Sequence, residues 1–172
     1  MKDRIFVIDG SSYLYRAYHA MPPLSTSSGQ PTGAVKGVTN MLMNLKKDSE
    51  GSSIIVVFDA KGKTFRSDIY SEYKANRPPM PDELRDQLLP VKSICRAIGF
   101  PLIEIDGVEA DDVIATIAKM AKDANYKCVI SSLDKDLMQL VEDPHTTLMD
   151  TMKHKIFNEE GVFEKFGVKP NQ

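Results

Sequence analysis

Short apolar runs alternate with amphipathic stretches along most of the 172 residues, and this alternation constrains the fold more than any other feature of the sequence. Four runs are rich in Ile and Val and nearly continuous in apolar character, as strands covered on both faces should be. They span residues 4–9, 53–59, 101–105 and 127–131. Between them, apolar residues recur at helical spacing, which predicts helices over residues 11–21, 33–48, 81–99 and 111–124. This order predicts one α/β domain, with a mostly parallel, doubly wound sheet and helices on both faces.

The segment of residues 60–81 interrupts the alternation, because it is long for a connection and connections of that length tend to be functional. Its basic residues outnumber its acids, and aromatic side chains lie between them. The basic residues are Lys61, Lys63, Arg66, Lys74 and Arg77, the acids are Asp68 and Glu72, and the aromatics include Phe65, Tyr70 and Tyr73. The tail from residue 149 onward has the pattern of a hairpin followed by a short helix.

Composition places the chain among ordinary globular proteins. Hydrophobic residues make up 42% and charged residues 27%, and the formal net charge is -2. The net charge gives no sign of a nucleic-acid partner, although a local basic patch would suffice for one. Cys95 and Cys128 match no zinc spacing, which predicts two buried, reduced thiols. The first residues lack an apolar run long enough for a signal peptide or a membrane span, so we expect a cytoplasmic protein with no membrane contact.

Acids follow each predicted strand at, or a few residues beyond, its carboxyl end. They are Asp9, Asp59, then Glu109, Asp111 and Asp112, and finally Asp134. The carboxyl ends of the strands in an open α/β sheet share one edge, where ligands bind. The acids are therefore predicted to converge in space although they are scattered in sequence.

Helix capping is the alternative explanation of these acids. A lone Asp before a helix is usually a cap worth about 1 kcal/mol, and the stretch "EADD" taken alone fits that interpretation. Capping does not explain the repetition at every strand end. Clustered carboxylates repel one another, and oxygen ligands without His or Cys favour Mg²⁺, with Mn²⁺ as a substitute. Glu109 and Asp112 share one side of a first helical turn while Asp111 points about 100° away, which suits two neighbouring metal positions.

A metal site beside a basic, aromatic segment indicates phosphodiester chemistry. Two divalent ions can activate water and stabilise a leaving oxygen without a protein general base. Lys74 and Arg77 could stabilise charge on the scissile phosphate, and Tyr73 could stack on a base. The alternative is a solvated loop with an aromatic side chain packed into the core.

Four stretches together resemble a known family. They are "VIDGSSYLYRAYHAMPPL", "VVFDAKGKTFRSDIYSEYKANRPPMP", "GVEADDVIATIA" and "SSLDKDLMQLV". In this order they are similar to the 5′-nuclease domain at the N-terminus of bacterial DNA polymerases I, in the flap endonuclease family. The resemblance implies a PIN-like, resolvase-like nuclease core over residues 1–172, with an arch-like insertion at about 60–81. It also implies a Mg²⁺-dependent, structure-specific 5′-3′ exonuclease or flap endonuclease, which acts in primer removal and DNA repair.

The resemblance assigns roles position by position. It implies that Asp9, Asp59, Glu109 and Asp111 bind a first metal and that Asp112 and Asp134 belong to a second. It implies that Arg16, Tyr73, Lys74 and Arg77 contact DNA, and that Lys74 and Arg77 act at the scissile phosphate. The expected partners are DNA with a 5′ flap or nick and RNA primer–DNA hybrids. The expected setting is a monomer in the bacterial cytoplasm, associated with the nucleoid, with polymerase domains on the same chain.

The sequence also departs from the family pattern. Leu133 stands before Asp134, where relatives carry a small residue, and Asp136 is expected to start a helix. The family's "Gly-Asp-x-x-Asp-Asn" segment and helix–hairpin–helix region are absent, so we expect weak or no activity from this chain alone. One alternative is a non-catalytic DNA-binding module. Others are an Asp-dependent phosphatase, disfavoured because Ser11 occupies the place of its general acid, and a receiver-like domain, which leaves the basic segment without a role.

Overall fold

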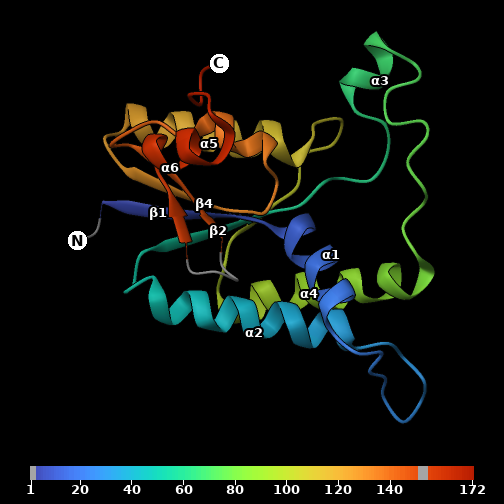
Figure 1. Ribbon diagram of the computed structural model, residues 1–172. Coiled ribbons are helices and arrows are strands. Elements are labelled where there is room, and N and C mark those ends of the chain that lie inside the picture. The colour runs from blue at the N-terminus through green and yellow to red at the C-terminus, as the bar shows by residue number, and fades with distance from the viewer. Residues whose placement is uncertain (1–2, 151–154) are drawn as a thin grey trace.

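The computed structural model describes residues 3–150 and 155–172, and in this part of the chain helices cover both faces of one six-stranded sheet (Figure 1). The strand order is β3-β2-β1-β4-β5-β6, in which neighbouring strands are parallel except that β6 runs antiparallel to β5. The strands are β1 (Arg4–Asp9), β2 (Ser53–Val57), β3 (Leu102–Ile103), β4 (Lys127–Ser131), β5 (Thr146–Asp150) and β6 (Lys155–Phe157). The helices are α1 (Gly10–Ala20), α2 (Gly33–Asp48), α3 (Phe65–Ile69), α4 (Asp82–Ile98), α5 (Ala110–Asp123) and α6 (Glu159–Phe166), with the 3₁₀ helix η1 (Asp136–Leu140). The predicted α/β fold with a mostly parallel, doubly wound sheet is confirmed.

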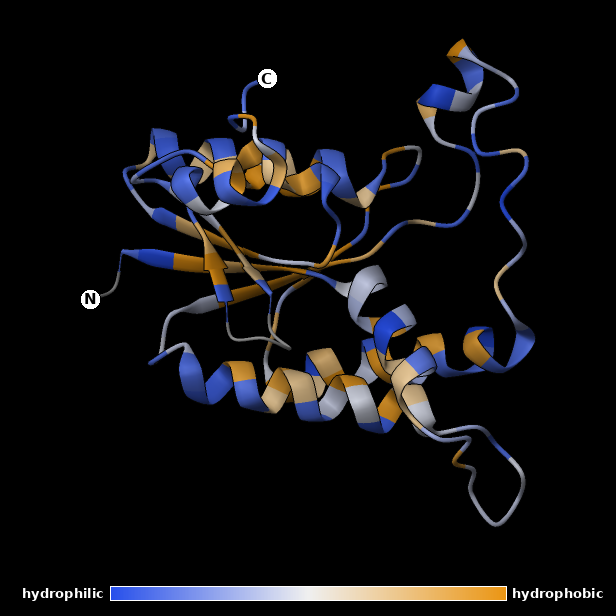
Figure 2. Ribbon diagram, viewed as in Figure 1, coloured by the Kyte–Doolittle hydropathy of each residue, from blue (hydrophilic) through white to orange (hydrophobic). Residues whose placement is uncertain are grey.

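Each face of the sheet carries its own hydrophobic core, because successive side chains of a strand point to opposite faces. In β1, Phe6 and Ile8 belong to the core formed with α1, α2 and α4, whereas Val7 belongs to the core formed with α5, η1 and α6. Figure 2 shows the apolar strands between helices that turn polar surfaces outward. Cys95 and Cys128 are buried free thiols, one in each core, as predicted.

The connections change direction between β1 and β4, which are neighbours in the sheet. After β1 the chain builds β2 and then β3 on one side, and α5 carries it back to β4 on the other side. In an open α/β sheet the loops diverge at such a point and leave a crevice beyond the carboxyl ends of the strands. Asp9 ends β1 at this edge.

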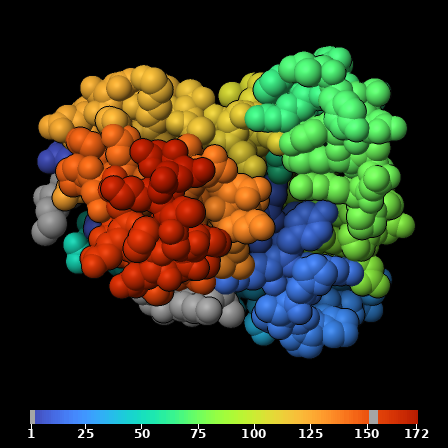
Figure 3. Space-filling view, turned by 45° about the horizontal axis from the view of Figure 1, so that its top comes forward, coloured from blue at the N-terminus to red at the C-terminus, as the bar shows by residue number. Residues whose placement is uncertain are grey.

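Residues 60–81, which we call the arch, cross this edge from one face of the sheet to the other. They leave β2, form α3 near the start of α5, and return to α4 on the opposite face (Figure 1). The Phe65 N–H donates to the Gly107 carbonyl at 2.9 Å, so the backbone of α3 is joined to the loop before α5. In the space-filling view the arch forms a lobe at one side of the molecule (Figure 3, green).

The strands differ in detail from the sequence-based prediction. β3 has two residues in place of 101–105, and β2 ends at Val57 in place of residue 59. β5 was not predicted as a fifth parallel strand, because its sequence, TTLMD, holds only two apolar residues. The antiparallel β5–β6 pair and α6 confirm the hairpin and short helix expected in the tail, with residues 151–154 outside the described part. None of the helices described is long and apolar enough to cross a membrane.

Candidate active site

Asp9 caps α1 and is also held by the end of β4. Its Oδ1 accepts the Ser12 N–H at 2.9 Å, and its Oδ2 accepts the Ser132 hydroxyl at 2.7 Å. The residue is only 5% exposed. Burial raises the pKa of this carboxyl, opposed by the two hydrogen bonds and reinforced by the nearby charges of Asp59 and Asp134. Capping therefore accounts for one oxygen of Asp9, and the Ser132 hydroxyl binds the second oxygen.

Gly10 lets the β1–α1 turn pack tightly against the end of β2. A Cβ added at this position would lie 2.6 Å from the ring of Phe58, a contact that side chains do not tolerate. Phe58 directly precedes Asp59, so this packing fixes the distance between the acids that follow β1 and β2. A glycine at this position follows from close packing and not from a need for unusual backbone angles.

Asp59 caps α5, although Glu109 is the residue at the N-cap position. Asp59 Oδ1 accepts the Ala110 N–H at 2.9 Å, and its Oδ2 accepts the Ser11 hydroxyl at 2.7 Å. Glu109 makes no capping hydrogen bond with its side chain. The capping interpretation is therefore wrong for Glu109, because an acid from another strand end has taken that role.

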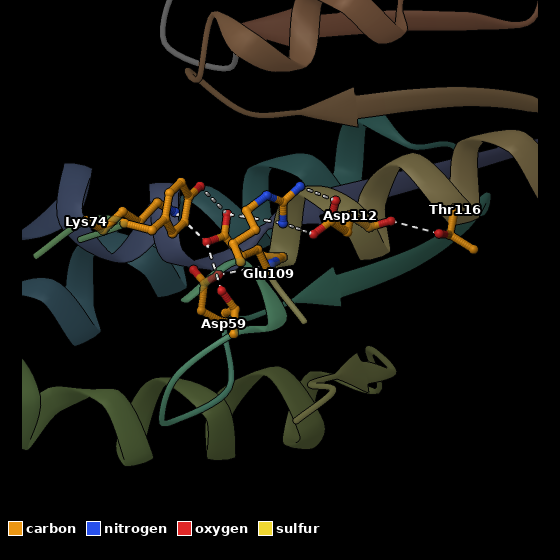
Figure 4. Close-up of polar contacts among 9 residues, drawn as sticks. Asp59, Lys74, Glu109, Asp112 and Thr116 are labelled. Carbon is orange, nitrogen blue, oxygen red and sulfur yellow. Dashed lines mark hydrogen bonds and ion pairs between the residues drawn. The ribbon is translucent and has the colours of Figure 1, made fainter. Parts of the chain in front are cut away.

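Glu109 faces the arch instead. Its carboxylate is within 2.9 Å of Lys74 Nζ, and it accepts hydrogen bonds from the Tyr73 hydroxyl at 3.2 Å and the Thr64 hydroxyl at 3.4 Å. Figure 4 shows Glu109 at the centre of these contacts, with Lys74 on one side and Asp112 on the other. Glu109 is 6% exposed, so Tyr73 and Lys74, in the part of the arch that leads back to α4 (the returning limb), are bound by a buried carboxylate.

A cleft of about 570 Å³ brings most of the predicted site residues together. Its acids are Asp9, Asp59, Glu109, Asp111, Asp134 and Asp136, and the arch contributes Tyr73, Lys74 and Arg77. Burial raises the pKa of Asp111 to about 6, helped by the charges of Asp9, Asp134 and Asp59. The convergence of acids from separate strand ends is confirmed for Asp9, Asp59, Glu109, Asp111 and Asp134. Asp136 was not predicted to join them; it starts η1, as the expected helix-starting acid, and also lines the cleft.

Asp112 does not line this cleft. Its carboxylate forms a bidentate ion pair with Arg66, whose Nη2 lies 2.8 Å from Oδ1 and whose Nη1 contacts Oδ2. The guanidinium holds the pKa of Asp112 below its usual value. Asp111 and Asp112 therefore point to different environments, as the helical spacing predicted.

The three predicted DNA-contacting residues of the arch stand at the cleft. Lys74 has a φ of 57°, which is uncommon for a residue with a side chain. Burial lowers the pKa of Lys74, but the Glu109 carboxylate outweighs this effect and raises it overall. Arg77 is exposed and forms no ion pair with any residue that the structure describes.

Arg16 lies elsewhere. It forms an ion pair with Asp150 at the end of β5, with 3.3 Å between Nη2 and Oδ1. Its side chain is 14% exposed, and it does not line the acidic cleft. Arg16 therefore pairs with Asp150 and not with a cleft acid, although Ser12 and Tyr15 of the same helix line the cleft.

The oxygen-only donor set of the cleft fits a divalent cation such as Mg²⁺ or Mn²⁺. Asp9 and Asp111 have raised pKa values from burial and from neighbouring carboxylates, a repulsion that a cation would remove. Within residues 3–150 and 155–172, no three Asp, Glu, His or Cys side chains already have the mutual arrangement of a metal site. Ser11, Ser132 and Lys74 each bind one of the cleft carboxylates.

A family model described as the 5′-3′ exonuclease, N-terminal resolvase-like domain, matches residues 4–167. The chain belongs to this family. It is 57% identical over 166 residues to DNA polymerase I of Pseudomonas aeruginosa, covering 96% of the chain and 18% of that protein. It is 44% identical over 168 residues to a 5′-3′ exonuclease of Aquifex aeolicus, covering 98% of the chain and 58% of that protein. The resemblance to polymerase-linked 5′-nucleases is thereby confirmed.

Solved structures agree on the fold of this exonuclease-family chain. A bacteriophage T5 flap endonuclease in a pseudo-enzyme–product complex with DNA and metal ions has a TM-score of 0.75 at 22% identity, covering 96% of the chain and 61% of that protein. A T5 protein co-crystallised with metal ions has a TM-score of 0.72 at 24% identity, covering 96% and 60%. At these identities the likeness supports the fold alone.

Some residues of the exonuclease-family site were missed by sequence reasoning. Ser11 and Ser132 donate to Asp59 and Asp9, and Arg66 binds Asp112. Ser132 directly follows the fourth predicted strand, a position that could have marked it. Arg66 carried no signal beyond the basic composition of the arch, because its partner lies 46 positions along the chain.

Proposed function

We propose that the chain is the α/β core of a metal-dependent 5′-nuclease that hydrolyses phosphodiesters in DNA. The observation that carries the proposal is the cleft, in which acids from β1, β2, α5 and the segment after β4 face cations of the arch. Family membership and the named activity of the 44% identical exonuclease support the same activity. The chain spans 18% of the Pseudomonas polymerase and 58% of the Aquifex exonuclease. The proposal therefore concerns the nuclease activity of this core and not the activities of the whole relatives.

The residues proposed to hold Mg²⁺ are the cleft acids, with Asp112 added when it leaves Arg66. At the first metal position the proposed ligands are Asp9, Asp59, Glu109 and Asp111. At the second metal position they are Asp112 and Asp134. A divalent cation supplies, when bound, Lewis acidity toward water and toward the phosphate. Mutual repulsion of the carboxylates supports this assignment, because the folded chain keeps several acids together at one edge without an equal number of cations.

The arch is proposed to orient the substrate phosphate. Arg77 is exposed at the cleft and free of ion pairs among the described residues, so its guanidinium can bind a phosphate oxygen without first losing a partner. Lys74 is held by Glu109 at 2.9 Å and becomes available when a cation takes over Glu109. Tyr73 lies beside both and supplies an aromatic surface for a base.

The proposed substrates are duplexes with a 5′ flap or nick and RNA primer–DNA hybrids, as in primer removal and repair. The 57% identical relative is a DNA polymerase I, which supports a DNA substrate. We further propose that the chain acts as a monomer in the bacterial cytoplasm and that the arch contacts DNA at the cleft.

A single-turnover assay tests the proposed activity. The chain in excess over a 5′-labelled flap duplex should release the flap slowly in Mg²⁺ or Mn²⁺ and not in EDTA. Asp111→Asn should abolish the product, and Asp86→Asn, an exposed acid of α4, should leave the rate unchanged. Cleavage that persists in EDTA, or in Asp111→Asn, would contradict the proposal.

A non-catalytic DNA-binding module is the second candidate. It is favoured by the ion pairs of Glu109 with Lys74 and of Asp112 with Arg66, which occupy two of the proposed metal ligands. Salt-dependent binding of the same duplex without any divalent-dependent product would support this candidate over the nuclease.

A further inference from the structure

Arg66 connects the arch to α5 by a pair of charge-assisted hydrogen bonds. The guanidinium meets both oxygens of Asp112, the geometry in which Arg binds a carboxylate most strongly. Its Nη1 also lies 3.7 Å from Glu109 Oε2, and its plane packs over the Phe65 ring at 4.7 Å. Arg66 is therefore fixed by partners on α5 and on α3.

Other contacts of the arch converge on the loop and N-cap residue just before α5. In the part of the arch that leads from β2 (the outgoing limb), the Phe65 N–H donates to the Gly107 carbonyl and the Thr64 hydroxyl donates to the Glu109 carboxylate. On the returning limb, Lys74 and Tyr73 bind Glu109. The arch is thus docked on the acids at the start of α5, with Lys74 at Glu109 (Figure 4) and with Arg66 in a bidentate contact with Asp112.

Arg66 and Lys74 lie beside the two carboxylates at the start of α5, Asp112 and Glu109. Glu109 is buried and Asp112 is about one-third exposed, so both need a counter-charge when the cleft holds no other cation. Arg66 and Lys74 provide that charge from the arch. A divalent ion that draws Asp112 or Glu109 into the cleft must take these carboxylates from the arch cations.

We propose that Arg66 is a positioning residue that competes with a divalent cation for Asp112, so that metal binding and docking of the arch on α5 oppose each other. The proposal rests on the metal site proposed above. Arg66 keeps Asp112 out of the cleft while the arch is docked. Capture of Asp112 in the cleft frees the guanidinium and loosens the docking of α3 on the start of α5.

Arg66→Gln separates this role from simple structural support. Removing one unit charge a few ångströms from the acids should lower the Kd for Mn²⁺ roughly five- to tenfold, measured by calorimetry and by the loss of the free-ion paramagnetic resonance signal. Partial unfolding would weaken Mn²⁺ binding, so tighter binding cannot arise from damage to the fold. Arg66→Lys keeps the charge without the bidentate geometry, so its Kd for Mn²⁺ should lie between those of the wild type and Arg66→Gln.

Arg85→Gln is the matched control, because Arg85 also pairs with an exposed acid, Asp82, but on α4 and away from the cleft. It should leave the Kd unchanged. Asp112→Asn should weaken Mn²⁺ binding, opposite in sign to Arg66→Gln. Without metal, both Arg66→Gln and Asp112→Asn should speed hydrogen exchange of the Phe65 amide by more than about tenfold, and Arg85→Gln should not.

The outcomes separate this inference from the proposed function. If the wild-type chain binds Mn²⁺ but Arg66→Gln binds it no more tightly, competition by Arg66 is refuted and the metal site stands. If the wild-type chain does not bind Mn²⁺, the metal site and the competition both fail. Unchanged exchange of the Phe65 amide in Arg66→Gln would refute the docking role whatever the metal affinity.

Discussion

Asp111→Asn should stabilise the metal-free protein at neutral pH, although it removes a proposed metal ligand. The carboxyl of Asp111 has a pKa of about 6, against 3.8 for an ordinary Asp. Because the folded-state pKa is raised, the native state holds a proton that the unfolded chain has already lost between these values. The contribution of Asp111 to the free energy of unfolding therefore falls as pH rises from about 4 to above 6, and is constant at higher pH.

The size of the effect follows from the same shift. A displacement from 3.8 to about 6 corresponds to about 3 kcal/mol of destabilisation above pH 7. Asp111 is partly exposed, so solvent screening reduces this to about 1–2 kcal/mol. The mutant also loses a favourable acid in the first turn of α5, worth about 0.5 kcal/mol. We expect a net gain of about 1 kcal/mol for Asp111→Asn at pH 7.5 and no gain near pH 4.

Urea unfolding in EDTA, followed by circular dichroism from pH 4 to pH 8, measures this difference. Asp86→Asn, at an exposed position of α4, is the control and should match the wild type throughout. Adding MgCl₂ should then stabilise the wild type more than Asp111→Asn, because the cation relieves the same repulsion. A mutant that is less stable than the wild type at pH 7.5, or a difference that does not vary with pH, would refute the electrostatic argument.

Three further predictions concern the packing, exposure or burial of particular side chains. Gly10→Ala should lower the free energy of unfolding by about 1–3 kcal/mol, because its Cβ would meet the Phe58 ring at 2.6 Å; an unchanged urea midpoint would mean that the ring yields freely. Arg77→Ala should reduce flap cleavage at least about tenfold without changing the melting temperature, since the exposed side chain has no ion pair among described residues; equal losses of both would point to a structural role. Cys95 and Cys128 should resist thiol reagents in the folded protein, because burial raises their pKa values to about 11 and about 12; rapid labelling without denaturant would show that a core opens.

Local sequence patterns were sufficient to predict most strands and helices and to place the acids at one edge of the sheet. Continuous apolar runs predicted β1, β2 and β4, and helical spacing predicted the long helices, because each pattern reports burial of neighbouring residues. Asp9 and Asp59 could be placed at one edge because parallel strands share their carboxyl ends. β5 escaped prediction because few of its residues are apolar, and its place in the sheet depends on pairing with β4.

Tertiary structure alone decided which donor each acid meets. Asp59 caps α5 across 51 positions, Arg66 binds Asp112 across 46, and Arg16 pairs with Asp150 across 134. No local pattern encodes such contacts, because charged side chains take the partners that folding brings within reach. The sequence by itself determined an acidic edge on a doubly wound sheet, and the path of the arch determined how those acids divide between the cleft and the arch cations.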